Sequence, residues 1–189
     1  MTRYEVLLFL HIAAAIVWLG GAMVVQLFAF RAERADDPLA MHRVASDAEW
    51  LAMRLFVPSS LVVLVLGILL VLDGPWGFDQ LWIVLGLAGY AFSFFLGILF
   101  LSPESGRIGR LIEAHGPTHE SVTSRIARIT AVSRVELAVL FAVVLDMTLK
   151  PTGDDAWFYV LAAAILLAGA ALALQGYRRP RGGPAADLA

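Results

Sequence analysis

Residues 4–30 decide the class of this protein, and they read YEVLLFLHIAAAIVWLGGAMVVQLFAF. This run is longer than the roughly 20 apolar residues with which an α-helix crosses about 30 Å of hydrocarbon. Further apolar stretches follow at residues 54–72, 81–101, 135–149 and 157–177. Lipid offers the backbone no hydrogen-bond partners, so such stretches must be helical. The sequence therefore predicts an all-α polytopic membrane bundle of five transmembrane helices, four forming a core and the fifth packed outside it.

The composition agrees with a membrane protein. The 189 residues are 60% apolar and 16% charged, whereas soluble domains are about 45–50% apolar and about 25% charged. A formal net charge of −2 argues against nucleic-acid binding by bulk charge. Without cysteine, the chain has no disulfide, thiolate metal site or cysteine nucleophile. The expected partner is the lipid bilayer.

Basic residues are concentrated in every second connection between the predicted spans. Arg31, Arg34 and Arg43 follow the first span, and the third-to-fourth connection holds Arg107, Arg110, Arg125 and Arg128. The opposite connections contain Asp73, Asp79 and a single Lys150. By the positive-inside rule, we expect a bacterial inner (plasma) membrane protein with its N-terminus outside and its C-terminus in the cytoplasm.

The connections carry start, stop and kink signals. Asp37 before Pro38 is typical of a helix N-cap, and Pro58 should kink the second span. Ser102-Pro103 repeats the start signal, which predicts a cytoplasmic helical segment over about 103–132 with a break at Gly116. The apolar stripe of that segment could lie on the inner membrane surface; it consists of Ile108, Leu111 and Ile112. We assign residues 1–178 to the membrane domain and predict a disordered cytoplasmic tail over 179–189.

One histidine lies within a predicted span, and intramembrane polar groups are the first functional candidates. At a rise of ~1.5 Å per residue, His11 lies roughly 10 Å below the outer end of span one, and Asp146 roughly 6 Å deep on the same side. Trp18 shares the helix face of His11. Three interpretations of His11 stay open: a structural hydrogen bond to Asp146 or a backbone carbonyl, a haem-iron ligand with Met147 as the second ligand, or proton relay or metal transfer.

A second polar group is expected at the inner edge. Arg54 and Glu136 begin spans two and four at the same depth, and Gln26 lies close by on span one. The economical interpretation is an Arg54–Glu136 ion pair, because a lone charge there is costly. The alternative is that each charged group reaches water separately. Elsewhere, Gly89, Ser93 and Gly97 form a ladder of small residues typical of close helix packing.

Several short motifs combine in a recognisable order. They are Phe9-Leu10-His11-Ile12, Val17-Trp18-Leu19-Gly20-Gly21, Arg54 with Pro58, Leu66-Gly67, Trp82 and Leu149-Lys150-Pro151. Over about residues 4–151 this combination resembles a family of small bacterial predicted integral membrane proteins of unknown function. It is distantly similar to HemJ-type protoporphyrinogen oxidases and to the membrane domain of copper-resistance D proteins.

The distant resemblances imply specific chemistry. The HemJ-type resemblance implies a b-type haem, with His11 matching the first-helix histidine. That family has a second histidine in the third helix, where this chain reads Gly89-Tyr90-Ala91-Phe92. The copper-protein resemblance implies copper uptake.

The expected function is that of a membrane protein without independent enzymatic activity, accessory to a redox, haem or metal process through His11. One alternative is a b-type-haem-dependent membrane oxidoreductase. Another is a transporter or a structural subunit of a membrane complex, and both a homo-oligomer and a partner subunit stay open.

Overall fold

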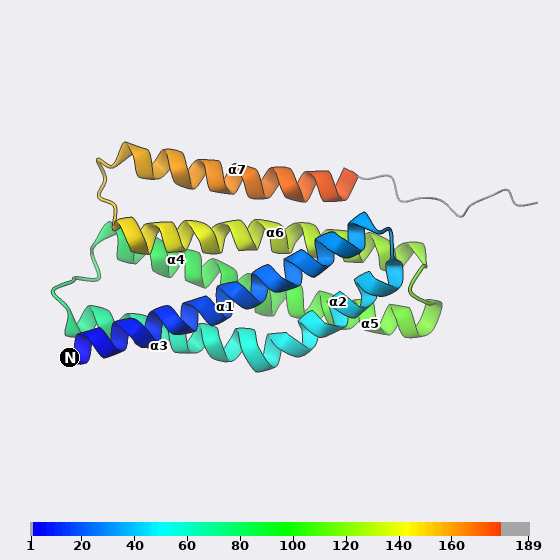
Figure 1. Ribbon diagram of the computed structural model, residues 1–189, viewed down its shortest axis with the longest axis horizontal. Helices are drawn as coiled ribbons and strands as arrows, with labels where there is room; N and C mark the ends of the chain where they lie inside the picture. The colour runs from blue at the N-terminus through cyan, green and yellow to red at the C-terminus, as the bar shows by residue number, and fades with distance from the viewer. Residues whose placement is uncertain (1, 179–189) are drawn as a thin grey trace, which may run out of the picture.

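The computed structural model describes residues 2–178, which form helices and connecting loops (Figure 1). The α-helices are α1 (Arg3–Arg34), α2 (Pro38–Leu51), α3 (Val57–Asp73), α4 (Leu81–Leu96), α5 (Ser102–His115), α6 (Glu120–Leu149) and α7 (Ala156–Arg178). Two π-helical turns, η1 (Ala52–Phe56) and η2 (Gly97–Leu101), connect α2 to α3 and α4 to α5. The predicted all-α class is confirmed, and the tail at 179–189 lies outside the described residues.

Two proline residues explain the two π-helical turns. A proline has no N–H for the carbonyl four residues earlier, and its ring clashes with that carbonyl. For Pro58 that carbonyl belongs to η1, and for Pro103 it belongs to η2. The N–H groups of Val57 and Ser102 instead bond to carbonyls five residues back, as a π-turn requires. The expected kink at Pro58 is confirmed as a bend between α2 and α3 (Figure 1).

The predicted start of a new helix at Ser102 is wrong. Ser102 does not cap a new helix, because the chain runs from α4 through η2 into α5 in helical conformation. The predicted break at Gly116 is confirmed, with φ +84°. Asp37 does cap α2, since its side chain accepts hydrogen bonds from the backbone N–H groups of Leu39 and Ala40 at 3.0 Å.

A small hydrophobic core lies at the end of the bundle where α2, α5 and α6 meet. Ile108, Val122 and Ile126 are buried there, with Met41, Leu111, Ile112 and Ile129 packed around them. The stripe of α5 is therefore covered by protein rather than lying on a membrane surface. Helix α1 has 32 residues, a length of about 48 Å, so the bundle is longer than about 30 Å of hydrocarbon.

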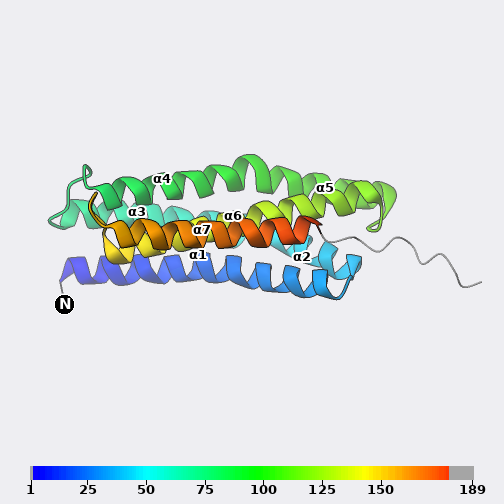
Figure 2. The same cartoon turned by 90° about the horizontal axis from the view of Figure 1, so that it is seen from above.

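Small residues bring the apolar helices together. A Cβ at Gly86 would stand 1.9 Å from Met147 Cε, and one at Gly89 would stand 2.4 Å from Val143 Cγ2, so α4 lies directly on α6. On the opposite side, a Cβ at Gly169 would stand 2.4 Å from Ala138 Cβ. Figures 1 and 2 show α7 alongside α6 at the edge of the bundle. Since lipid supplies little hydrophobic force between helices, close backbone approach supplies the contact.

Four helical stretches are long and apolar enough to cross a membrane; they are Arg3–Arg34, Leu39–Asp73, Leu81–His115 and Ala156–Gly176. Helix α6 is not among them, so the predicted fourth span, residues 135–149, is not supported by length and composition. Residues 2–178 are therefore all-helical apart from their connecting loops, and they contain four candidate membrane-spanning helices.

We predict that Gly89→Ala destabilises the bundle by about 1–3 kcal/mol, because the added methyl group overpacks the α4–α6 contact. Gly97→Ala is the matched control, since a Cβ at that position meets no atom within 4 Å. Thermal unfolding of both purified variants measures the difference. Equal melting temperatures for the two variants would contradict the close α4–α6 packing.

Candidate functional site

Two cavities lie between the helices. The first, called the histidine cavity, has a volume of about 510 Å³ and is lined by His11, Trp18, Tyr90, Met147 and Lys150 among mostly apolar residues. The second, called the glutamate cavity, has a volume of about 350 Å³ and is lined by Trp18, Gln26, Ser60, Ser93 and Glu136 among others. Trp18 lines both cavities and contacts Tyr90 edge-to-face, with ring centroids 5.7 Å apart.

His11 is held by helix α3. Its Nδ1 lies 3.0 Å from the carbonyl oxygen of Val63, and because a carbonyl only accepts, Nδ1 must donate the proton. The neutral ring then has Nε2 as a free acceptor. Gly67 makes room for the ring, since a Cβ there would stand 3.2 Å from His11 Cε1. Of the open interpretations, the structural hydrogen bond to a backbone carbonyl is the one that these atoms form.

Asp146 does not join His11 in the way that the sequence suggested. Among the described residues neither carboxylate oxygen of Asp146 has a hydrogen-bond partner, although the residue is 2% exposed. Its Oδ2 lies 3.4 Å from the position of a Cβ on Gly86, so the carboxylate packs against α4. The predicted His11–Asp146 hydrogen bond is therefore not formed, because His11 bonds to α3 and Asp146 lies against α4.

Met147 lines the histidine cavity together with His11 and Trp18. Its Sδ lies 3.6 Å from the position of a Cβ on Gly86, where α4 and α6 touch. The cavity lining thus offers one imidazole and one thioether as side chains that can coordinate a metal ion. They are the types of side chain that hold haem iron in His/Met sites. The described residues contain no cluster of three or more His, Cys, Asp or Glu side chains suited to a metal ion.

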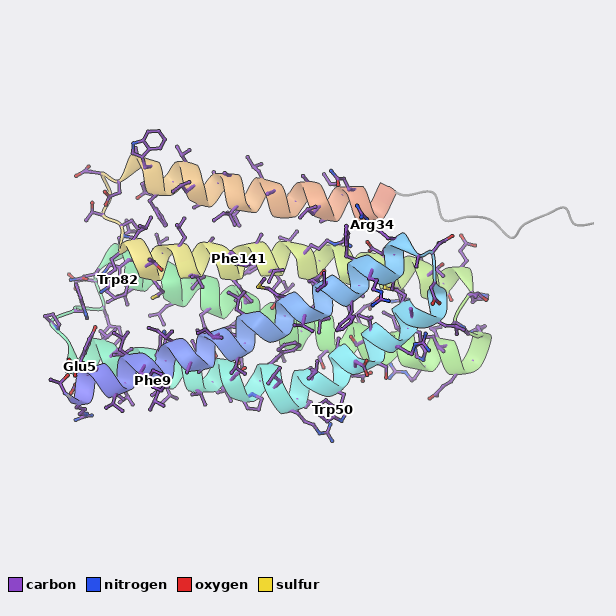
Figure 3. All side chains as sticks on the ribbon, in the orientation of Figure 1. Glu5, Phe9, Arg34, Trp50, Trp82 and Phe141 are labelled. Atoms are coloured by element: carbon purple, nitrogen blue, oxygen red, sulfur yellow. The ribbon has the colours of Figure 1, made fainter. Side chains whose placement is uncertain are left out.

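An aromatic and basic group forms one end of the histidine cavity. Lys150 ends α6 in left-handed conformation, with φ +48°. Its Nζ lies 4.2 Å from the ring centre of Trp76 and 5.3 Å from that of Trp82. The Trp76 Nε1–H donates to the Tyr4 hydroxyl at 3.3 Å. Trp82 and Glu5 lie at the same end of the bundle, opposite Arg34 (Figure 3).

The predicted Arg54–Glu136 ion pair is wrong. Arg54 lies over the ring of Trp50, 4.6 Å from its centre, and Figure 3 shows Trp50 pointing away from the bundle. Arg54 is exposed because η1 places its side chain on the outer face. Glu136 and Gln26 both line the glutamate cavity.

Two other ion pairs, in which at least the acid is mostly buried, connect helices of the described chain, and sequence reasoning missed both. Arg134 on α6 pairs with Glu33 on α1, with side chains only 11% and 15% exposed. Glu104 on α5 is 3% exposed and pairs with Arg125 on α6 at 2.7 Å. The sequence did contain a signal for the Glu33–Arg134 pair. Glu33 lies near the end of the first long helix and Arg134 at the start of the fourth apolar stretch, so the two residues are at a similar depth.

We predict that Arg134→Gln destabilises the protein by about 3–5 kcal/mol, because it leaves the Glu33 carboxylate without its partner in a poorly hydrated place. Arg54→Gln removes the same charge from an exposed position and should cost less than about 1 kcal/mol. Chemical denaturation of the two variants in one detergent compares them. A larger loss for Arg54→Gln would mean that the Glu33–Arg134 pair does not connect α1 to α6.

A scan against known protein families matched this chain over residues 5–151. The matched family is described as "Predicted integral membrane protein (DUF2269)". Searches of curated proteins and of solved structures gave no match. The matched region begins in α1, ends directly after α6 and includes both cavities. The chain therefore belongs to the DUF2269 family of integral membrane proteins, whose function is unknown.

Proposed function

We propose that this protein crosses the membrane five times and binds a largely apolar small molecule in the histidine cavity, with His11 as its polar contact. The observation that carries the proposal is the Nδ1–Val63 hydrogen bond, which leaves Nε2 as a free acceptor on a side chain lining this cavity. Ligand sites commonly combine apolar walls, volumes of about 300–1,000 Å³ and a few polar groups that orient the ligand.

Helix α6 is the span that we add to the four candidates, and it is the fourth of the five in chain order. It packs against α1, α2, α4, α5 and α7, so its polar residues can face protein instead of lipid. Intramembrane Asp and Glu side chains are tolerated on such inward faces. The interior position explains why hydropathy alone does not identify α6. With the arginine-rich end on the cytoplasmic side of a bacterial inner membrane, the N-terminus lies outside and the C-terminus inside.

This topology predicts opposite accessibility for the loop after α6 and for the exposed face of α5. Because the chain has no cysteine, Asp154→Cys and Glu113→Cys each introduce a single thiol. A membrane-impermeant maleimide added to intact spheroplasts should label Asp154→Cys, and should label Glu113→Cys only after permeabilisation. Labelling of both variants from one side would rule out α6 as a membrane span.

Haem b is the second candidate ligand, in line with a redox accessory or oxidoreductase role. The observation that favours it is that His11 and Met147 line the same cavity. His11 would hold the iron through Nε2, and the Val63 carbonyl would fix the ring orientation, as second-shell groups do for metal-bound histidines. A bound haem would supply one-electron chemistry. Around it, Trp18 and the apolar walls would exclude water.

We expect protein purified from membranes to retain its ligand, and the absorption spectrum distinguishes the two candidates. A Soret band that is lost in His11→Gln identifies haem, whereas a colourless protein carrying an extractable apolar molecule identifies a different ligand. The matched control is His42→Gln, which changes a histidine outside the cavity. If His11→Gln and wild type carry the same ligand in the same amount, the proposed role of His11 is wrong.

A further inference from the structure

The glutamate cavity differs in charge from the histidine cavity. Its ionisable lining residues are Glu49 and Glu136, and no Lys, Arg or His is among the described residues that line it. The histidine cavity, in contrast, is lined by His11 and Lys150 without an acidic residue in its described lining. The two cavities therefore differ in the charge of their ionisable lining residues.

Glu136 has no cationic partner among the described residues. Arg134, the nearest arginine along α6, pairs with Glu33 and donates to the Leu172 carbonyl. Arg54, the predicted partner, lies over Trp50 on the outer face. A partly buried carboxylate without a counter-ion is costly, so a cation bound beside Glu136 would stabilise its charged form.

Two other polar groups in the lining of the glutamate cavity also lack partners within the described chain. The Oε1 atom of Gln26 is buried and accepts no hydrogen bond. Ser93 is 1% exposed, and its hydroxyl oxygen has no partner. Both residues line the glutamate cavity from opposite helices, α1 and α4. Buried polar atoms in proteins are nearly always paired, and those that are not point to a missing partner.

Most of the remaining lining residues are apolar or aromatic, and the others are serine and threonine residues. Trp18, Phe56 and Phe94 line the cavity, and so does Gly97, at which an added Cβ would meet nothing within 4 Å. Aromatic faces attract organic cations, while the apolar surface stabilises a hydrophobic body. Glu49 is exposed and stands at the cavity wall, where it would attract a cation approaching from water.

From these contacts we infer that the glutamate cavity is a binding site for a lipophilic organic cation, with Glu136 as its counter-ion. The Glu136 carboxylate balances the positive charge of the ligand. The Gln26 oxygen is the negative end of the amide dipole and also favours a cation. The aromatic side chains enclose the apolar part of the ligand. An anion of the same size would meet two carboxylates, Glu49 and Glu136, and no Lys, Arg or His among the described lining residues. This site does not include His11, so the cation-binding proposal can be tested independently of the ligand proposed for the histidine cavity.

The test uses two apolar ions of similar shape and opposite charge. Isothermal titration calorimetry of the purified full chain with tetraphenylphosphonium should show binding, and titration with tetraphenylborate should show affinity at least about tenfold weaker. Glu136→Gln should weaken tetraphenylphosphonium binding by about tenfold or more, the usual effect of losing a charged contact. Glu113→Gln, an exposed acid outside the cavity, and His11→Gln should leave the affinity unchanged.

A second variant locates the site and covers the case in which Glu136→Gln does not fold. Gly97→Leu extends a side chain into open space at the cavity wall, so it should abolish tetraphenylphosphonium binding while the melting temperature is preserved. Absence of tetraphenylphosphonium binding, equal affinity for the two ions, or unchanged binding in folded Glu136→Gln or Gly97→Leu would each overturn the inference.

Discussion

Close contact between α6 and its neighbours is the constraint on which the rest of this structure depends. Helix α6 packs against α1, α2, α4, α5 and α7. Gly86 and Gly89 let α4 reach it, and Gly169 lets α7 reach it. Lipid does not drive apolar helices together as water does, so backbone approach and buried ion pairs must hold them. The Glu33–Arg134 pair adds such a link between α1 and α6.

The glutamate cavity follows from how the two bent helices are built. Pro58 and Pro103 each force a π-helical turn, and residues of both turns line the glutamate cavity: Ala52, Met53 and Phe56 from η1, and Gly97, Ile98 and Leu101 from η2. Two prolines thus account for local widening of the helices at the cavity wall. π-turns occur often at functional sites for this reason, because they redirect side chains without ending the helix.

Trp18 is shared by the linings of the two cavities. It is 9% exposed, lines both cavities and packs on Tyr90. On one side lie the imidazole of His11 and the ammonium of Lys150, and on the other lies the carboxylate of Glu136. Trp18 thus borders two cavities whose ionisable lining residues differ in charge.

Local patterns were enough to predict the helical class, the Asp37 cap, the bend at Pro58 and the break at Gly116, because these depend on residues close together in the chain. The same patterns singled out His11, Trp18, Gln26 and Glu136 as candidate site residues, since polar groups within a membrane are costly. Their partners depend on contacts between helices that are far apart in the sequence. His11 bonds to Val63 rather than Asp146, and Arg134 rather than Arg54 forms the buried pair with an acid. Depth along a helix follows from counting residues, but the direction of a side chain depends on helix rotation, which the π-turns and glycine contacts set.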